Sequence, residues 1–303
     1  MNCPHCQKQN HVVKTGLRHS STGPIQKYYC KSCLKYFTDK TQPHIQYPLH
    51  VILYALESYN KGYPVTQVKT KTGRKYRYSP PIRTIYSWIS RYSPVLNFLP
   101  LRKTFNLQPD HLSTTHKMYH QQIYPFTIHH LKLNIASKQL PQLRRYINWI
   151  KRNLPTKMFL HGPRASQSKT QIQVNPIKKD NYLTKLTEYA LASHHKQKST
   201  HEKVESFFLI NDAYTVCTEL PVFLNPKETT IFNIDTPLTG HIDIIQIKND
   251  TLHIMDYKPN LRHPRHYAGQ LMAYKEAIHH RTRISKEKII TAVFNHHSYY
   301  EYK

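Results

Sequence analysis

Three side chains near the carboxyl end of the chain are spaced as a hydrolytic site would need them. In GHIDIIQIKNDTLHIMDYKP (240–259), Asp243 opens one isoleucine-rich run, and Asp256 and Lys258 close the next. Carboxylate oxygens are the ligands that Mg²⁺ and Mn²⁺ prefer, and such ions lower the pKa of bound water. A lysine beside them would orient that water or stabilise the charged phosphate. The trio predicts metal-assisted hydrolysis of a phosphodiester.

A β-hairpin must position these side chains. Strands over about 241–247 and 251–258 would flank a short polar turn. Asp256 and Lys258, two residues apart on a strand, would then point the same way. The alternative is an exposed ion pair at a strand edge, which is worth little. The apolar run before Asp256 favours a buried strand, where charges are rare unless they are paired or bound to metal.

The elements around the hairpin are predicted from the same kinds of pattern. Their order is helix, strand, strand, strand, helix, strand, with the outer elements over 181–211, 215–223, 266–278 and 288–294.

This segment resembles the PD-(D/E)XK nuclease superfamily, and within it the branch of RecB-type and Cas4-like nucleases. Four short pieces match in the family's order: HEKVE with His201 and Glu205, GHID with Asp243, MDYKP with Asp256 and Lys258, and QLMAY with Gln270 and Tyr274. The resemblance covers about 115 residues, and its specificity comes from the ordered combination because each piece alone is short. It implies a restriction-endonuclease-like α/β domain, with a central mixed sheet flanked by helices, that acts as a metal-dependent deoxyribonuclease.

The expected ligands of Mg²⁺ or Mn²⁺ are Asp243, Asp256 and the carbonyl of Tyr257. The resemblance adds His201, whose nitrogen would favour Mn²⁺. The expected catalytic residues are those of the GHID, MDYKP and QLMAY pieces: Asp243, Asp256, Lys258, Gln270 and Tyr274.

Two further acids have open roles. Glu205 is either a metal ligand or a neighbour on the helix surface. Glu219 either assists the metal site or is a charge on an edge strand. Gln270 would contact the scissile strand or the water network, although Gln270 and Tyr274 at this spacing also suit ordinary helix packing.

Four cysteines at the other end of the chain form two CxxC pairs, Cys3/Cys6 and Cys30/Cys33. Thiolates at this spacing converge on one structural Zn²⁺, whereas a reducing compartment disfavours disulfides and a redox dithiol needs a single pair. The stretch resembles the zinc ribbons that open many transposases.

Cas4-like nucleases hold an iron–sulfur cluster through four cysteines around the nuclease fold. Because the nuclease segment here has only Cys217, we expect no iron–sulfur cluster and a small buried side chain at that position.

Charge divides the chain into two parts. The net charge is +27, and residues 1–179 hold 29 lysines and arginines against three acids, while residues 180–303 hold 15 against 14. A surface that is merely soluble would mix the two signs. The strong positive charge of residues 1–179 indicates a polyanionic partner, and nucleic acid is the usual one.

A transposase-type helix-turn-helix is expected over about 44–95. Helices around 49–56 and 82–89 would enclose a basic loop at 69–78. The second helix would bury an apolar side comprising Ile82, Ile85, Tyr86 and Ile89. The DNA contacts expected from this region are Arg74, Lys75, Arg77, Arg83 and Arg91.

We therefore expect a multidomain α+β protein with a zinc ribbon (1–40), a helix-turn-helix region (41–100), a basic helical connector (101–179) and a nuclease domain (180–303). It would bind and cut DNA in a mobile-element, defence or repair context. The alternatives are a non-cleaving DNA-binding regulator on a degenerate nuclease fold, and an RNA-processing nuclease. Symmetric double-strand cleavage would require a homodimer. The sequence lacks a membrane-span pattern, so a cytoplasmic, intracellular location is expected.

Overall fold

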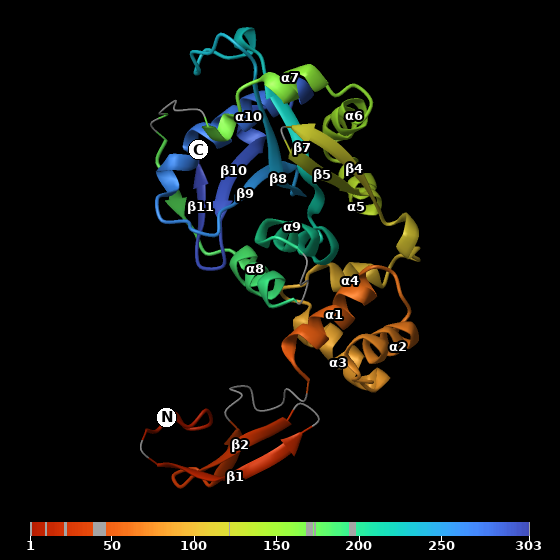
Figure 1. Cartoon of the computed structure of the whole chain (residues 1–303), viewed down its shortest axis with the longest axis vertical. Helices are drawn as coiled ribbons and strands as arrows, with labels where there is room; N and C mark the ends of the chain where they lie inside the picture. Colours follow the sequence, from red (N-terminus) through yellow and green to blue (C-terminus); the bar gives the residue numbers. More distant parts are fainter. Residues whose placement is uncertain are drawn as a thin grey trace. The chain divides into compact units, whose positions relative to one another are not determined.

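The computed structural model describes residues 2–9, 11–20, 23–38, 47–120, 122–167, 172, 174–193 and 198–302. The chain divides into two compact units, Met1–Leu49 and His50–Lys303, and each is described by itself (Figure 1). Among the described residues, no helix combines the length and the apolar character that crossing a bilayer requires.

The first unit is a small antiparallel sheet with the strand order β1-β2-β3, formed by Val12–Ser20, Gly23–Cys30 and Lys35–Thr38. Its buried apolar cluster consists of Cys3, Tyr28, Cys30 and Phe37, and the rings of Tyr28 and Phe37 are stacked with centroids 5.5 Å apart. The core formed by the described residues of this unit is small, and small units of this kind are usually stabilised by disulfides or a metal ion.

The second unit begins with helices α1 (Leu49–Asn60), α2 (Val65–Tyr76), α3 (Ile82–Tyr92) and α4 (Phe98–Arg102). The expectation of a basic loop at 69–78 is wrong, because most of this stretch lies in α2. Val65, Val68 and Thr72 fall on one side of that helix and are buried, which stabilises a helix in spite of its basic composition. The helix ends at Arg77, whose left-handed backbone (φ 59°) lets its N–H bond to the Gly73 carbonyl.

The buried side of α3 differs from the predicted one. Ile85 and Ile89 are buried as expected, but Trp88 and Tyr92 complete the side, at positions i, i+3, i+4 and i+7. Ile82 and Tyr86, expected to be buried, are 38% and 53% exposed. The physical reason is that the bulky side chains of Trp88 and Tyr92 are buried together with the two isoleucines. The buried side of the helix is therefore rotated about the helix axis, away from Ile82 and Tyr86.

An eight-stranded mixed sheet forms the body of the second unit, in the order β4-β5-β7-β8-β9-β10-β11-β6 (Figure 1). All neighbouring strands are antiparallel except β9 and β10, which are parallel. The strands are β4 (Ser113–His120), β5 (Gln122–His129), β6 (Ile177–Lys178), β7 (Thr215–Leu224), β8 (Leu238–Lys248), β9 (Thr251–Tyr257), β10 (Ile289–Phe294) and β11 (Tyr299–Tyr302).

The predicted hairpin is β8–β9, and the flanking strands predicted at 215–223 and 288–294 are β7 and β10. The single helix expected over 181–211 is instead two helices among the described residues, α8 (Tyr182–Ala192) and α9 (Thr200–Asn211). A capping box between Ser199 and Glu202 starts α9, because each side chain bonds to the other's backbone N–H. The helix predicted at 266–278 is α10 (Ala268–Thr282).

The segment 101–179, expected to be a helical connector, also contributes strands. Its β4–β5 hairpin joins the main sheet through Thr127↔Thr218 and Ile128↔Cys217. Helices α5 (His130–Ala136), α6 (Pro141–Ile150) and α7 (Thr156–His161) follow, and α6 buries Leu143, Tyr146, Ile147 and Ile150. Short 3₁₀ turns complete the unit: η1 (Pro109–His111), η2 (Ala165–Gln167), η3 (Pro226–Glu228), η4 (Pro264–Tyr267) and η5 (Lys286–Lys288).

The helical region packs directly on helix α9. Asn60, the last residue of α1, donates from Nδ2 to Asn211 Oδ1 at 2.9 Å, and both residues are fully buried. Asn97 Oδ1 accepts from the backbone N–H of Ala213 at 2.6 Å. A buried amide pair is costly to separate, because each half would lose a hydrogen bond without gaining water. The start of the second unit is therefore tied to the helix that carries His201 and Glu205.

Candidate active site

Three acids form a row across three neighbouring strands. The pairs Thr218↔Ile244 and Leu220↔Ile242 set Glu219 of β7 opposite Asp243 of β8. The pair Ile244↔Met255 brings Asp256 of β9 opposite Asp243 from the other side. Residues directly opposite one another share a face of the sheet. The register of the sheet thus gathers carboxylates that lie 24 and 13 positions apart in the sequence.

The backbone at Glu219 is strained. Its φ of +55° lies in the left-handed region, and no ladder pair joins Glu219 to Asp243, although the register is the same on both sides. Such a conformation in a non-glycine residue costs on the order of 1–3 kcal/mol and concentrates at functional sites. The regular pairing of β7 with β8 is therefore interrupted at Glu219, the residue whose carboxylate lies beside that of Asp243.

Helix α9 adds a fourth carboxylate. One oxygen each of Glu205, Glu219 and Asp243 lie within 4.8 Å of one another, and all three residues are buried. Neither Glu205 Oε1 nor Glu219 Oε2 has a hydrogen-bond partner among the residues that the structure describes. Buried carboxylate oxygens are normally satisfied, and these three acids form a group that could hold a metal ion.

The electrostatics of these acids agree with a shared cation. Burial, followed by repulsion from neighbouring carboxylates, raises the pKa of Glu205 and of Asp243 well above the ordinary values. Burial and the charge of Asp256 raise the pKa of Glu219 to about 7. Several buried carboxylates cannot all ionise at neutral pH without a cation. A divalent metal ion would remove the repulsion that raises these pKa values.

Asp256 is held by two partners beside the row. Lys258 Nζ lies 2.6 Å from Asp256 Oδ2, and Gln270 Nε2 of α10 donates to Asp256 Oδ1 at 3.0 Å. Gln270 also donates to the Tyr274 hydroxyl at 3.0 Å. Burial opposes the charge on Lys258, but the Asp256 and Asp243 carboxylates outweigh it and raise the pKa of the ammonium group. Lys258 therefore stays positively charged at the edge of the carboxylate row.

The backbone of Tyr257 connects two further groups. Its N–H donates to Asp243 Oδ2 at 2.8 Å, and His201 Nε2 lies 2.9 Å from its carbonyl oxygen. This contact is a hydrogen bond, and it holds the imidazole of α9 beside the end of β9. Burial lowers the pKa of His201, which favours the neutral imidazole that metals bind.

The structure thus brings every predicted catalytic residue to one place: Asp243, Asp256, Lys258, Gln270 and Tyr274. It also places one carboxylate oxygen of Glu205 and one of Glu219 within 4.8 Å of an oxygen of Asp243, in a group that could hold a metal ion. His201 approaches the site through the carbonyl of Tyr257.

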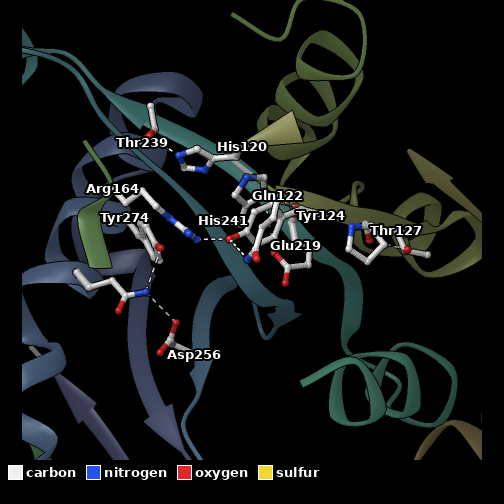
Figure 2. A network of polar contacts seen from close by, with 12 residues as sticks. His120, Gln122, Tyr124, Thr127, Arg164, Glu219, Thr239, His241, Asp256 and Tyr274 are labelled. Atoms are coloured by element: carbon white, nitrogen blue, oxygen red, sulfur yellow. Dashed lines mark hydrogen bonds and ion pairs between the residues drawn. The ribbon is translucent and has the colours of Figure 1, made fainter. Parts of the chain in front are cut away.

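Sequence reasoning missed a second set of polar residues next to the row (Figure 2). His241 stacks on the Tyr124 ring with centroids 4.0 Å apart, and its Nδ1 lies 3.8 Å from Glu219 Oε2. Arg164 donates to the Tyr124 hydroxyl. Burial lowers the pKa of His241 to about 3, so it is neutral. No sequence pattern singled out Tyr124 or Arg164, because they come from the segment for which no chemical role was predicted.

The four paired cysteines lie close together in the first unit. Cys3 Sγ is 3.6 Å from Cys33 Sγ, and Cys6 Sγ is 3.7 Å from Cys30 Sγ. Four thiolates at about 2.3 Å from a tetrahedral Zn²⁺ would be about 3.8 Å apart, so the spacing suits zinc. The four cysteines could therefore bind one zinc ion. Cys217 is a separate, fully buried side chain on β7.

The predicted DNA-contacting residues lie on or beside α2 and α3, and all are exposed: Arg74, Lys75, Arg77, Arg83 and Arg91. The Lys75 ammonium lies 4.1 Å from the centroid of the Tyr54 ring. The exposed Tyr86 adds an aromatic ring to the outer side of α3.

Comparison of the chain with protein-family models, with curated proteins and with solved structures gives no significant match. The functional argument therefore depends on the site itself.

Proposed function

We propose that this protein is a metal-dependent nuclease that hydrolyses DNA phosphodiester bonds. The observation that carries the proposal is the cluster of Glu205, Glu219 and Asp243, with its unpartnered buried oxygens, beside the Asp256–Lys258 ion pair. Buried acids next to the charged ammonium group of Lys258 suit an anionic substrate. The acids would bind a metal cation, and that cation would bind the substrate. The order α9, β7, β8, β9, α10, β10 supports a restriction-endonuclease-like core of the PD-(D/E)XK type.

The donor set fits Mg²⁺ or Mn²⁺. Carboxylates of Asp243, Glu205 and Glu219 would hold the ion, with Asp256, the Tyr257 carbonyl and His201 at the adjoining edge. When bound, such an ion neutralises phosphate charge and lowers the pKa of a coordinated water.

The remaining residues have roles that follow from their contacts. Lys258 presents an ammonium group beside Asp256, where it can stabilise charge that develops on the phosphate. Gln270 holds one oxygen of Asp256, and Tyr274 holds the same amide from the other side. Together these contacts keep the acid and the amine of the Asp-x-Lys pair in one geometry.

The cationic front part would supply DNA binding. Its exposed arginines and lysines on α2 and α3 suit phosphate contacts, and the four-cysteine site would hold a structural zinc ion in a second DNA-docking unit. We infer that capture of DNA and hydrolysis are assigned to different parts of the chain.

A cleavage assay with a matched pair of lysine variants tests the proposal. Purified protein is incubated with linear, circular and single-stranded DNA, and with RNA, in Mg²⁺ or Mn²⁺. Lys258→Met should lower the cleavage rate by about 10²–10³-fold, because it removes a charge preorganised for the transition state. The control is Lys286→Met, because Lys286 also lies 2.6 Å from a buried carboxylate, that of Glu276.

The outcomes separate the candidate functions. Lys258→Met should still shift DNA in a gel, and Lys286→Met should cleave at the wild-type rate. Equal cleavage by wild type and Lys258→Met would refute the catalytic role. DNA binding with no cleavage of any substrate would favour the non-cleaving regulator, and preference for RNA would favour the RNA-processing nuclease.

A further inference from the structure

Arg164 is fixed to the strand that carries Asp243. Thr239, near the start of β8, donates its backbone N–H to the Pro163 carbonyl at 2.9 Å and forms a parallel bridge with Arg164. The Thr239 hydroxyl lies 3.0 Å from His120 Nε2 and 3.1 Å from the Pro163 carbonyl. These contacts hold the Arg164 backbone beside Thr239, which precedes Asp243 by four residues on β8.

The guanidinium group of Arg164 reaches toward the carboxylate row (Figure 2). It lies over the Tyr124 ring at 5.3 Å from the centroid and donates to the Tyr124 hydroxyl, which also accepts from Gln122 Nε2 at 2.6 Å. Its positive charge acts on Glu219, where it opposes the rise in pKa that burial causes. Arg164 is therefore a cation at the Glu219 end of the row, while Lys258 is a cation at the Asp256 end.

Two other arginines of the same unit show the two kinds of partner that a guanidinium group finds inside the protein, backbone carbonyls and a carboxylate, although the Nε of Arg281 is buried without a partner among the described residues. Arg102 donates to the carbonyls of Tyr59, Gly62 and Phe105 at 3.0, 2.9 and 3.1 Å. Arg281 lies over the Phe223 ring and is neutralised by Glu228 at 2.7 Å.

Arg164 has neither kind of partner within the part of the chain that the structure describes. Its one recorded hydrogen bond there goes to the neutral hydroxyl of Tyr124, and its Nε is buried without a partner. A guanidinium group carries five N–H donors and cannot lose its charge, so a half-buried one needs an anion. The neighbouring carboxylates are the proposed ligands of a metal ion, which leaves an external anion as the partner.

We propose that Arg164 binds a phosphate of the nucleic-acid strand at the Glu219 end of the site, opposite Lys258. This inference rests on the proposed nuclease function and adds the residue that orients the strand. A planar guanidinium group forms paired hydrogen bonds to a phosphate, and the ring and hydroxyl of Tyr124 already hold it in place. Arg164 and Lys258 would then contact the strand from the two ends of the carboxylate row and fix its direction across the sheet.

The test compares arginine variants on DNA with single neutral phosphates. The cleavage position is first mapped on an end-labelled duplex, and a set of duplexes is made with one methylphosphonate at each position around it. Binding is measured with Ca²⁺ in place of Mg²⁺, and kcat/KM with Mg²⁺. Arg164→Met keeps the length of the side chain without the charge, Arg164→Lys keeps the charge without the fork, and Arg281→Met is the control. Tryptophan-fluorescence unfolding confirms that each variant is folded.

Arg164→Met should lose about 10- to 100-fold in binding and in kcat/KM, the loss expected for hydrogen bonds to a charged group. Arg164→Lys should recover part of this loss, and Arg281→Met should behave as wild type. One methylphosphonate position should weaken the wild type to the level of Arg164→Met and leave Arg164→Met unchanged.

Three results distinguish the failure of this inference from failure of the nuclease function. If wild type cleaves and Arg164→Met cleaves and binds equally well, Arg164 does not contact the strand. The same conclusion follows if every methylphosphonate weakens both proteins by the same factor. If wild type cleaves nothing, the nuclease proposal fails, while binding of wild type, Arg164→Met and Arg164→Lys to the unmodified duplex still decides whether Arg164 contacts the strand.

Discussion

Replacing Glu219 by glutamine should stabilise the metal-free protein while it impairs the metal site. Glu219 is buried, is strained in its backbone and lies among other carboxylates, so its charge is unfavourable in the folded state. Glutamine keeps the size and the left-handed backbone but removes the charge. The substitution therefore isolates the electrostatic cost of one ligand.

The structure gives the sign and the size of the effect. Burial and Asp256 raise the pKa of Glu219 from 4.5 to about 7. Between these values the folded state holds a proton that the unfolded state has released, so stability falls as the pH rises from 4.5 to 7 and stays low above 7. Each pH unit of this window corresponds to about 1.4 kcal/mol, so the penalty above pH 7 is about 3 kcal/mol. Glu219→Gln should gain between about 1 and 3 kcal/mol at pH 8, because burying the amide offsets part of the benefit.

Urea unfolding followed by tryptophan fluorescence measures this, because both tryptophans, Trp88 and Trp149, lie in the second unit. The advantage of Glu219→Gln should vanish at pH 4.5. Added Mn²⁺ should stabilise wild type more than the variant, because binding to the folded state alone adds stability.

The control is Glu276→Gln, which removes a buried carboxylate that Lys286 neutralises. This variant should be less stable than wild type at pH 8. The reasoning fails if Glu219→Gln is also less stable there without metal, or if its gain is the same at pH 4.5 and pH 8.

Two further predictions concern zinc and the glycine of β8. Cys30→Ser should abolish zinc binding, measured as metal content, and weaken DNA binding in a gel shift. The unfolding midpoint measured by tryptophan fluorescence should stay unchanged, because both tryptophans lie in the second unit. A lowered midpoint would contradict the division into two units. Gly240→Ala should cost about 1–3 kcal/mol and slow cleavage, because its Cβ would lie 2.4 Å from Cε1 of Tyr274 and displace the partner of Gln270. Wild-type activity in Gly240→Ala would show that this contact does not matter.

The hairpin and its flanking strands could be predicted because their sequence is apolar, rich in isoleucine and interrupted by a polar turn. The β4–β5 hairpin could not. Its residues include many histidines, threonines and tyrosines, and β5 becomes a strand by pairing with β7 at Thr127↔Thr218 and Ile128↔Cys217. Such pairing depends on distant residues, which a local pattern does not contain.

The candidate site shows the same limit. Asp243, Asp256 and Lys258 stand out because they interrupt apolar strands close together in sequence. The closeness of Glu205 and Glu219 to Asp243 depends on the β7–β8 register and on where α9 packs, so it could not be predicted from the sequence. Arg164 gave no signal, because the backbone bonds of Thr239 bring a turn-like segment to the sheet.

The length of α9 is constrained at both ends. Asn211 pairs with Asn60 of α1, while Glu205, six residues earlier, joins the carboxylate cluster. A single inserted or deleted residue between them would rotate one end against the other by about 100°, since an α-helix has 3.6 residues per turn. Substitutions on the outer surface of this helix should therefore be tolerated in evolution, whereas changes in the number of residues between 205 and 211 should be eliminated.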